Sequence, residues 1–362
     1  MKILFMITGL GMGGAERQVC DLADKYVQLG HRVLFVVLGG DVNNRPSEQS
    51  VAVMNLNMKK TPLGFISAYF KARKIIKEFE PDVVHSHMVH ANIFARLLRL
   101  VTKYPTLICT AHNTNEGGKI RMLAYKLTDR LANISTNVSQ DALASFLQKK
   151  AAPDGRMIVM GNGIDIAKFQ FNSSSRDKKR KEVGICDSVK LILAVGRLTE
   201  AKDYPNLLKA FSLLKDQSDC QLAIIGVGHL ENALKTLATS LEIDERVHWL
   251  GLRSDVAEWM SACDMFVLAS QWEGLPLVVA EAMSCKRIVV GTDSGGVKEM
   301  IRDSGILVPI KDHVKLAESI DYALQMPIDE IITRGENARR IVESDYSLDV
   351  ISKRWLSIYN EY

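Results

Sequence analysis

Two glutamates with seven residues between them, Glu273 and Glu281, stand in an otherwise apolar stretch of the sequence. Glu273 follows a predicted strand, Met265–Ala269, and precedes Pro276, which suits the first turn of a helix because its missing N–H costs little there. Glu281 then lies on a helix with apolar neighbours, where a carboxylate is costly without a partner. Two such acids beside the free N–H groups of a helix start match a ligand that carries hydroxyls and phosphates. A solvent-facing Glu281 is the plainer alternative.

Two cations, Arg197 and Lys202, follow another predicted strand, Leu191–Val195. Two positive charges on one loop suit a diphosphate, whose charge is best neutralised from two directions. The alternative is a solvated loop that ends in a helix cap at Asp203.

A glycine-rich loop, Gly9–Gly14, follows the first predicted strand and leads directly into a predicted helix. Glycines allow backbone N–H groups to approach an anion at a helix N-terminus, where the helix dipole adds attraction. The spacing fits the dinucleotide-binding fingerprint only loosely. A tight turn without a ligand is therefore an equal alternative for this loop.

These loops must be positioned by the elements between them. Short apolar runs alternate with amphipathic helical patterns along the chain, which is typical of βαβ units around parallel sheets. The predicted strands are Ile3–Ile7, Arg32–Leu38, Val51–Leu56, Val83–His85, Thr106–Ala111, Ile134–Val138, a strand around Met157–Met160, Leu191–Val195, Gln221–Ile225, Val247–Leu250, Met265–Ala269, Arg287–Val290 and Gly305–Val308. The clearest helical segments are Glu16–Leu29, Phe65–Phe79 and Asn92–Val101.

Two domains are expected, because 362 residues exceed what one hydrophobic core usually supports. We expect a Rossmann-like domain over residues 1–165, a second over 166–345, and a C-terminal helix over 346–362 that packs back toward the first domain. A polar stretch, Asn172–Lys181, is the best candidate for the boundary. Two such α/β domains facing a cleft would bind ligands at the carboxyl ends of their strands.

The net charge of +4 hides an uneven distribution, since residues 1–165 hold 21 Lys and Arg against 13 Asp and Glu. The first half is therefore basic and the second mildly acidic, which predicts an anionic partner for the first half. The six cysteines are scattered, and we expect buried, inert thiols in a reducing cytoplasm. No apolar run reaches the roughly 20 residues needed to span a bilayer.

The segment from Glu273 to Glu281, with Gly274-Leu275-Pro276 between, resembles the E-x7-E element of family 4 retaining glycosyltransferases, which have the GT-B fold. Further motifs match that family in the same order along essentially the whole chain. They are the pair Arg197 and Lys202, the glycine loop Gly11–Arg17 and the interdomain segment Asn162–Asp165. The resemblance is to enzymes of bacterial O-antigen and capsular polysaccharide synthesis.

The resemblance implies a role for each matching residue. Glu281 would bind the donor ribose and Glu273 the hydroxyls of the transferred sugar, while Arg197 and Lys202 would stabilise the leaving nucleoside diphosphate. His112 would approach the transferred sugar, although without the resemblance an ordinary loop histidine is the favoured interpretation. The remaining donor-binding residues implied are Gly13, Gly14, Arg253, Gly274, Leu275, Pro276 and Leu277.

We therefore predict an enzyme that moves a sugar, a HexNAc or hexose, from a UDP-sugar to a polyprenyl-diphosphate-linked glycan. The sequence contains no D-x-D pair, the usual carboxylate clamp for a divalent cation, so we expect catalysis without a metal or cofactor. A sugar-nucleotide epimerase on the same fold is the alternative, as is a transferase that uses GDP-mannose or a lipopolysaccharide-core acceptor. A nicotinamide-dependent oxidoreductase or a non-catalytic nucleotide-sugar module explains fewer of the motifs.

The basic half also suggests where the protein acts. Three segments, Phe65–Lys77, Ile93–Leu100 and Ile120–Lys126, mix apolar and cationic residues at helical spacing, as helices on an anionic bilayer do. Ordinary amphipathic helices that pack on a sheet are the alternative. Stacking aromatics are sparse, so no nucleic-acid partner is expected. We expect a cytoplasmic protein bound peripherally to the inner face of the cytoplasmic membrane.

Overall fold

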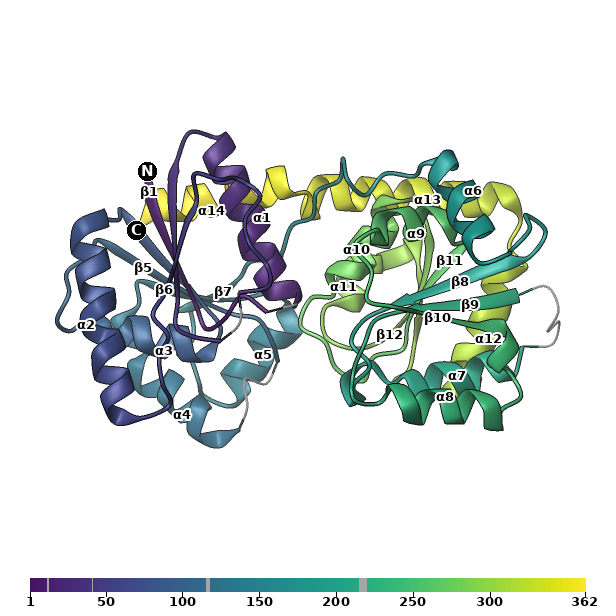
Figure 1. Ribbon diagram of the computed structural model, residues 1–362, viewed down its shortest axis with the longest axis horizontal. Helices are drawn as coiled ribbons and strands as arrows, with labels where there is room; N and C mark the ends of the chain where they lie inside the picture. The colour runs from purple at the N-terminus through teal and green to yellow at the C-terminus, as the bar shows by residue number, and fades with distance from the viewer. Residues whose placement is uncertain (12, 41, 115–117, 215–219) are drawn as a thin grey trace. The chain divides into compact units, whose positions relative to one another are not determined.

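The computed structural model describes residues 1–11, 13–40, 42–114, 118–214 and 220–362. Met12 of the glycine loop lies outside the described residues. The chain divides into two compact α/β units (Figure 1). The N-terminal unit comprises Met1–Gly163 and Leu348–Tyr362, and the C-terminal unit comprises Ile164–Ser347.

The described part of the N-terminal unit has one sheet of seven parallel strands, in the order β3-β2-β1-β4-β5-β6-β7. Its strands are β1 Lys2–Ile7, β2 Arg32–Val37, β3 Ala52–Asn55, β4 Val83–His87, β5 Thr106–Ala111, β6 Ile134–Asn137 and β7 Met157–Val159. Its helices are α1 Gly14–Gln28, α2 Pro62–Phe79, α3 Val89–Leu98, α4 Lys119–Thr128, the 3-10 helix η1 Asp129–Leu131, α5 Gln140–Gln148 and α14 Leu348–Glu361. The strands are buried along nearly their whole length, which explains their continuous apolar runs.

The C-terminal unit repeats the design with six parallel strands among its described residues, in the order β10-β9-β8-β11-β12-β13. Its strands are β8 Lys190–Val195, β9 Cys220–Ile225, β10 Val247–Gly251, β11 Met265–Leu268, β12 Ile288–Thr292 and β13 Ile306–Val308. Its helices are α6 Ser173–Glu182, α7 Tyr204–Ser212, α8 Glu231–Ser240, α9 Val256–Ala262, α10 Leu277–Ser284, α11 Val297–Ile301, α12 His313–Leu324 and α13 Ile328–Ile341. Short 3-10 turns η2 Glu200–Lys202, η4 Asp244–Arg246 and η5 Arg302–Ser304 and the π-helical turn η6 Val342–Tyr346 complete it.

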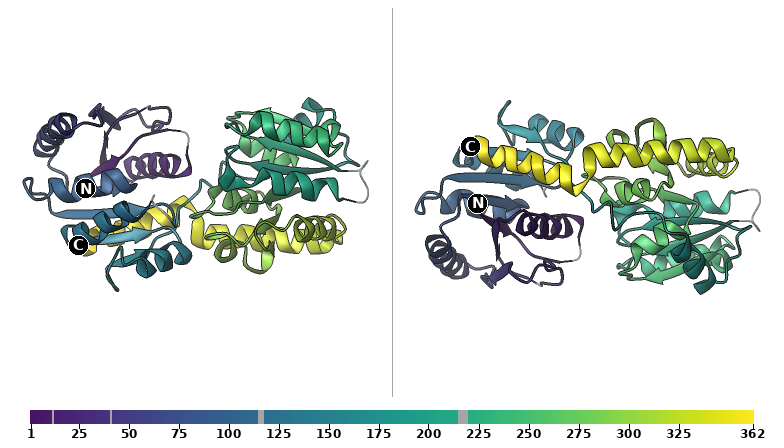
Figure 2. Two further views of the ribbon diagram at one scale, coloured as in Figure 1. Left: turned by 90° about the horizontal axis from the view of Figure 1, so that it is seen from below. Right: turned by 90° about the horizontal axis from the view of Figure 1, so that it is seen from above.

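The last helix, α14, belongs to the N-terminal unit although it is the end of the chain. Figure 2 shows it, in yellow, lying along that unit. Its side chains Trp355 and Tyr359 are buried in the core that surrounds Phe5, and α14 also contacts α1. The Tyr359 hydroxyl lies 2.7 Å from Nδ1 of His85 on β4, so α14 is fixed by polar as well as apolar contacts.

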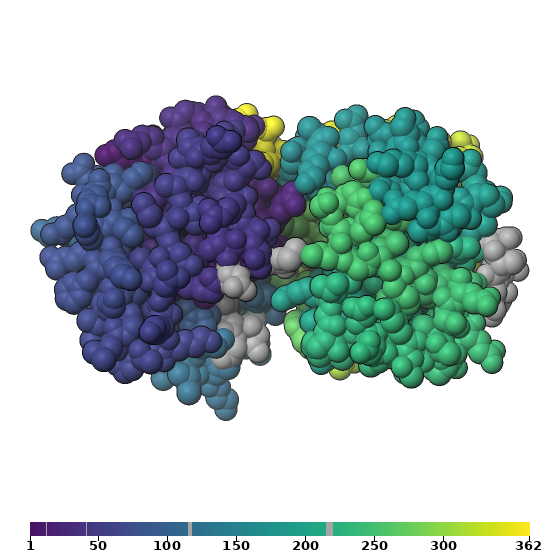
Figure 3. Space-filling model, in the orientation of Figure 1, coloured from purple at the N-terminus to yellow at the C-terminus, as the bar shows by residue number. Residues whose placement is uncertain are grey.

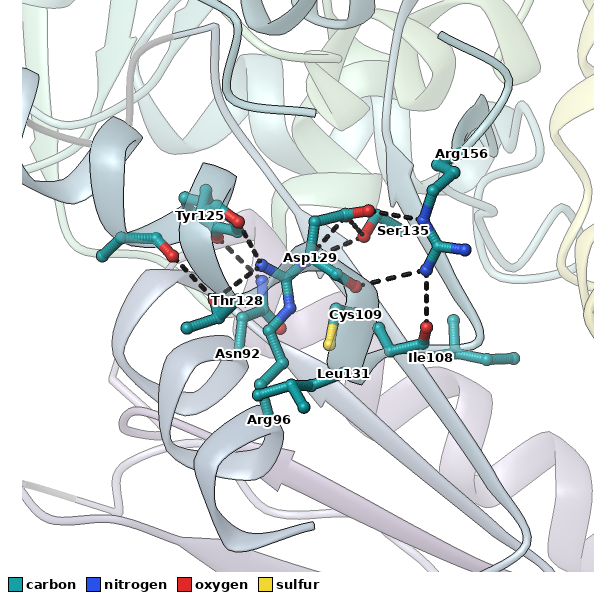
Figure 4. A network of polar contacts seen from close by, with 12 residues as sticks. Asn92, Arg96, Ile108, Cys109, Tyr125, Thr128, Asp129, Leu131, Ser135 and Arg156 are labelled. Atoms are coloured by element: carbon teal, nitrogen blue, oxygen red, sulfur yellow. Dashed lines mark hydrogen bonds and ion pairs between the residues drawn. The ribbon is translucent and has the colours of Figure 1, made fainter. Parts of the chain in front are cut away.

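A buried ion-pair network ties α3 to η1, to β6 and to the loop before β7 in the N-terminal unit (Figure 4). Arg96 and Asp129 are both fully buried, and Ser135 on β6 accepts from Arg96 at 2.7 Å and donates to Asp129 at 2.8 Å. Arg156 donates to the second carboxylate oxygen of Asp129 at 2.6 Å. A buried charge is tolerated only when it is paired and hydrogen-bonded in this way, so the network is structural.

The predicted strands are confirmed, with ends that agree to within two residues. The polar stretch Asn172–Lys181, however, is not a boundary but helix α6 of the C-terminal unit. Its cations find carboxylate partners there, since Arg176 and Arg180 bond to Asp264, just before β11. Composition alone could not show these partners, which lie far away in the sequence. The chain passes between the units at residues 163–164 and 347–348.

Two further expectations can be compared with the structure. All six cysteines are free; five are buried as predicted, but Cys186 is exposed in the polar loop between α6 and β8, so the expectation of buried thiols is wrong for that residue. None of the helices in the described ranges is both long enough and apolar enough to cross a membrane.

Candidate active site

The carboxyl ends of β8, β11 and β12 bring three loops of the C-terminal unit together. The backbone N–H of Gln271, after β11, donates to the carbonyl of Ala201, after β8, at 2.8 Å. The Thr292 hydroxyl, at the end of β12, donates to the carbonyl of Ser270 at 2.6 Å. The loop that carries Glu273 is therefore held from both sides by its neighbours.

Glu273 and Lys202, predicted from two separate motifs, form a direct ion pair. Lys202 Nζ lies 2.5 Å from Glu273 Oε1, and the Ser270 hydroxyl donates to the same oxygen at 2.6 Å. The side chains of Lys202 and Glu273 are 20% and 12% exposed, so the pair is shielded but still reachable by a ligand. Such a pair can hold hydroxyls on one side and phosphate oxygens on the other.

Arg197 lies on the same loop as Lys202, and its side chain is exposed. Within the described ranges, its guanidinium makes no hydrogen bond or ion pair. The loop therefore presents one cation that is already neutralised and one that is not. An unneutralised guanidinium beside a lysine is suited to receive an anionic ligand with bidentate geometry.

Two glycines allow these loops to approach one another closely. Gly226, after β9, has φ of +148°, and a Cβ there would lie 1.9 Å from the carbonyl oxygen of Gly196. Gly295, after β12, has φ of +56°, and a Cβ there would lie 2.3 Å from the carbonyl oxygen of Glu273. A larger residue at Gly295 would push the Glu273 loop out of place, and one at Gly226 would displace the loop that carries Arg197.

The segment after Glu273 lines the same edge of the sheet. Gly274, Leu275, Pro276 and Leu277 are all buried, and α10 begins at Leu277 directly after Pro276. Glu281 is half-buried on α10. Its side chain is therefore neither fully exposed to solvent nor fully buried. Trp272 was not singled out from the sequence; its side chain is 52% exposed directly beside Glu273.

Arg253 already has partners within the C-terminal unit. Its guanidinium donates to both carboxylate oxygens of Asp255, at 2.8 and 2.7 Å, pairs with Glu182 at 2.9 Å and lies over the ring of Trp259. These partners lie where α6 packs against α9. Any role of Arg253 in binding the nucleotide base would therefore compete with these ion pairs.

The glycine loop of the N-terminal unit ends at the start of α1, as predicted, with Gly13 as the residue before the helix and Gly14 as its first residue. The Glu16 side chain folds back over Gly13, as shown by the distance of only 2.3 Å between its Oε2 and a Cβ placed on Gly13. A carboxylate thus already lies where the helix dipole favours an anion. A ligand phosphate at Gly13 and Gly14 would have to share this position with the Glu16 carboxylate or displace that carboxylate.

His112 follows β5 and belongs to a buried group of three histidines. His87 Nδ1 lies 3.1 Å from His112 Nε2, and the ring centroids of His85 and His87 are 4.0 Å apart. Burial lowers the pKa of His112 to about 4 and the pKa values of His85 and His87 well below 6.5, so all three are neutral at pH 7. His85 and His87 were not predicted as site residues, although their alternate positions at the end of a strand were a usable signal.

Among the described His, Cys, Asp and Glu side chains, no group of three or more is placed to hold a metal ion.

Residues 12–168 match the family described as Glycosyltransferase Family 4, and residues 175–343 match the family described as Glycosyl transferases group 1. The chain belongs to the family 4 glycosyltransferases. Enzymes of this family retain the anomeric configuration and act without a metal, so the predicted reaction class is confirmed.

Individual relatives and solved structures resemble this glycosyltransferase along most of its length. It is 24% identical to N-acetyl-alpha-D-glucosaminyl L-malate synthase of Bacillus anthracis, covering 99% of this chain and 97% of that one. It is 24% identical to the Campylobacter jejuni N-acetylgalactosamine-N,N'-diacetylbacillosaminyl-diphospho-undecaprenol 4-alpha-N-acetylgalactosaminyltransferase, covering 90% of each chain. The crystal structure of Anabaena Alr3699/HepE in complex with UDP-glucose superposes with a TM-score of 0.88 at 23% identity, covering all of both chains, which confirms the predicted GT-B fold.

Proposed function

We propose that this glycosyltransferase binds a UDP-sugar at the carboxyl edge of the C-terminal sheet and transfers a HexNAc or hexose from it. The ion pair of Lys202 with Glu273, beside the unneutralised Arg197, carries the proposal. Arg197 and Lys202 neutralise the leaving diphosphate, Glu273 accepts hydrogen bonds from the sugar, and Glu281 accepts from the ribose. Gly274, Leu275, Pro276 and Leu277 line the pocket.

The chemistry follows from these positions. The bond between the anomeric carbon and the donor phosphate breaks, a bond from the acceptor oxygen forms on the same face, and the acceptor's proton leaves to a phosphate oxygen. Negative charge develops on the diphosphate as that bond breaks. Fixed cations at this point stabilise the transition state more than the bound substrate, which is how they accelerate the reaction.

The choice of donor and acceptor is supported by the relatives. The Campylobacter relative acts on a diphospho-undecaprenol-linked sugar, and the HepE crystal holds UDP-glucose. We propose a polyprenyl-diphosphate-linked glycan as the acceptor, bound by the N-terminal unit, in the assembly of a bacterial surface polysaccharide. We propose that His112 donates or accepts a hydrogen bond at the transferred sugar and that Gly13 and Gly14 contribute to donor binding.

Peripheral attachment to the inner face of the cytoplasmic membrane fits the surface of the N-terminal unit. On α2, Leu63 is 80% exposed, and on α4, Ile120 is 85% exposed, and both helices carry several cations. Figure 3 shows one face of the surface of the N-terminal unit, in purple and blue. The pKa of His90 at the start of α3 is lowered by burial and by the positive charges of Arg121 on α4 and Lys60 just before α2. Exposed apolar side chains among cations match an anionic bilayer.

A second acceptor class is favoured by one observation. The Bacillus relative, which aligns over nearly the full length of both chains, is named for a small soluble acceptor, L-malate. A free hydroxy acid is therefore the rival to the lipid-linked glycan for the same transfer reaction.

The proposal is tested with a panel of UDP-HexNAc, UDP-hexose and GDP-mannose donors, each offered a polyprenyl-diphosphate-linked sugar or L-malate. We expect transfer from a UDP-sugar to the lipid-linked acceptor, unaffected by EDTA, and loss of transfer in Glu273→Gln. The matched control is Glu200→Gln, which removes an exposed carboxylate two residues before Lys202 that pairs with His229 and not with Lys202. Release of an epimerised sugar nucleotide without transfer, or equal activity in Glu273→Gln, would contradict the proposal.

A further inference from the structure

Glu273 and Lys202 pair directly, although the proposed reaction uses them on different parts of the donor. Lys202 Nζ lies 2.5 Å from Glu273 Oε1, and the two side chains are 20% and 12% exposed. The same Oε1 accepts from the Ser270 hydroxyl at 2.6 Å, whereas Oε2 makes no hydrogen bond to the described residues. Glu273 therefore holds the cation with one oxygen and can offer the other to a ligand.

The loop that carries Glu273 keeps this carboxylate in place. The Gln271 N–H donates to the carbonyl of Ala201 at 2.8 Å, and the Thr292 hydroxyl donates to the carbonyl of Ser270 at 2.6 Å. Neither bond uses the side chain of Glu273, so the loop is held independently of its charge. A ligand that approaches the paired lysine therefore meets a negative charge at a fixed position.

The charge of Glu273 also reaches the neighbouring loop that carries Arg197. Tyr204 is buried, and its hydroxyl donates to the carbonyl of Gly196 at 3.1 Å. Burial and, after it, the negative charge of Glu273 raise the pKa of Tyr204. The Tyr204 hydroxyl therefore stays neutral, and the field of the carboxylate extends to the residue directly before Arg197.

A sugar nucleotide and a free nucleoside diphosphate present different groups to such a carboxylate. The hydroxyls of a bound sugar can donate to it, and the sugar ring becomes positive as its bond to phosphate breaks. Both are gone once the sugar has been transferred. The terminal phosphate of the free diphosphate then carries about one more negative charge at neutral pH, because its second ionisation lies near about pH 6. Repulsion from a carboxylate is strong at a shielded site.

We infer that Glu273 selects the sugar nucleotide over the free nucleoside diphosphate, because it offsets the charge of Lys202 and repels the diphosphate once the sugar has left. It is thus a specificity residue that weakens the binding of the product, in addition to contacting the sugar. This role rests on the function proposed above, in which the diphosphate binds at Arg197 and Lys202.

Removing the charge of Glu273 should therefore strengthen the binding of UDP. We expect full-length Glu273→Gln to bind UDP about tenfold more tightly than wild type at about pH 7.5, chiefly through slower dissociation, because one repulsive charge is removed. Titration calorimetry measures the affinity, and stopped-flow displacement measures the dissociation rate. The UDP-sugar that wild type transfers should gain no affinity in this variant, since its hydroxyls lose the carboxylate.

Two matched variants separate this effect from a general change of charge. Glu273→Asp keeps the charge on a shorter side chain and should bind UDP nearly as wild type does. Glu200→Gln removes the same charge from the turn that carries Lys202, but from an exposed side chain that pairs with His229. Solvent and salt screen that charge, so UDP affinity should change less than about twofold.

UDP affinity of Glu273→Gln equal to or below that of wild type would overturn the inference, as would equal tightening of UDP in Glu200→Gln or of the UDP-sugar in Glu273→Gln. If wild type still transfers a sugar in that case, the proposed function stands and only the selection by Glu273 is removed. Wild type that binds neither UDP nor a UDP-sugar would contradict both. If Glu273→Gln does not fold, Glu273→Ala, which also removes the charge, decides in the same way.

Discussion

The carboxyl edges of the two sheets are built from opposite kinds of polar group. In the C-terminal unit, Lys202, Glu273 and Arg197 are charged groups that keep contact with solvent. In the N-terminal unit, His87 and His112 are neutral and almost completely buried. The same strand–loop–helix design therefore supports two kinds of recognition, one by charge and one by uncharged hydrogen bonds.

The difference follows from how much water each edge retains. A partly exposed ion pair keeps its charges because solvent and partner both stabilise them, while a buried imidazole loses its charge because burial disfavours the protonated form. A departing diphosphate needs charge, and a sugar hydroxyl needs only a directed donor or acceptor. Four experiments test this difference between the two edges.

The largest effect is expected from removing the cations of the charged edge. Lys202→Ala and Arg197→Ala should each lower kcat with the UDP-sugar by roughly 10²–10³-fold, because the leaving diphosphate loses a fixed positive charge. Steady-state kinetics check this, with Lys209→Ala, an exposed lysine on α7, as the control. Loss confined to KM would mean that the cations bind the donor without stabilising the transition state.

The second change is pH, which should act on the neutral edge. Below pH 6.5 the unfolded chain binds a proton at His112 that the folded chain binds only near pH 4, so stability is complete above 6.5 and falls as pH drops toward about 4. The loss from His112 alone is roughly 3 kcal/mol. Urea unfolding of wild type and His112→Gln over this range measures it, and identical pH dependence in the two would contradict the burial of a neutral ring.

A third, smaller effect is expected from one glycine of the charged edge. Gly295→Ala places a Cβ against the Glu273 carbonyl at a φ of +56° and should cost about 1–3 kcal/mol together with part of the activity. Gly30→Ala is the control, since its φ is +82° but nothing lies within 4 Å of the added carbon. Equal losses of unfolding free energy in the two would show that backbone strain alone, and not the contact with the Glu273 loop, sets the cost.

The smallest effect is expected at the membrane surface. Leu63→Ser with Ile120→Ser should weaken flotation with anionic liposomes about tenfold or less at low salt, because two exposed apolar side chains no longer enter the bilayer. Leu252→Ser, which is exposed on the C-terminal unit, should leave flotation unchanged. Flotation of the double variant equal to that of wild type, or no liposome binding by wild type at all, would contradict the proposed peripheral attachment.

The sequence alone determined the elements and the charged edge. Continuous apolar runs mark strands that are buried on both faces, and polar residues directly after them must meet at one edge of a parallel sheet. This is why Glu273, Lys202 and Arg197 could be assigned to one edge of one sheet from their positions after strands, although only the structure gives the ion pair between the first two.

The contacts of the remaining side chains could not be predicted from the sequence, because they depend on long-range packing. The hydrogen bond of His87 to His112 depends on the pairing of β4 with β5, and the bond of His85 to Tyr359 joins residues 274 positions apart. The cations of α6 look solvated in the sequence and Arg253 was predicted at the donor site, but Asp264 binds the first and Glu182, also distant in the sequence, binds the second. Local periodicity indicates which residues are buried in the core. The partner of a polar side chain is instead set by long-range packing. The same packing decides whether a titratable side chain is charged.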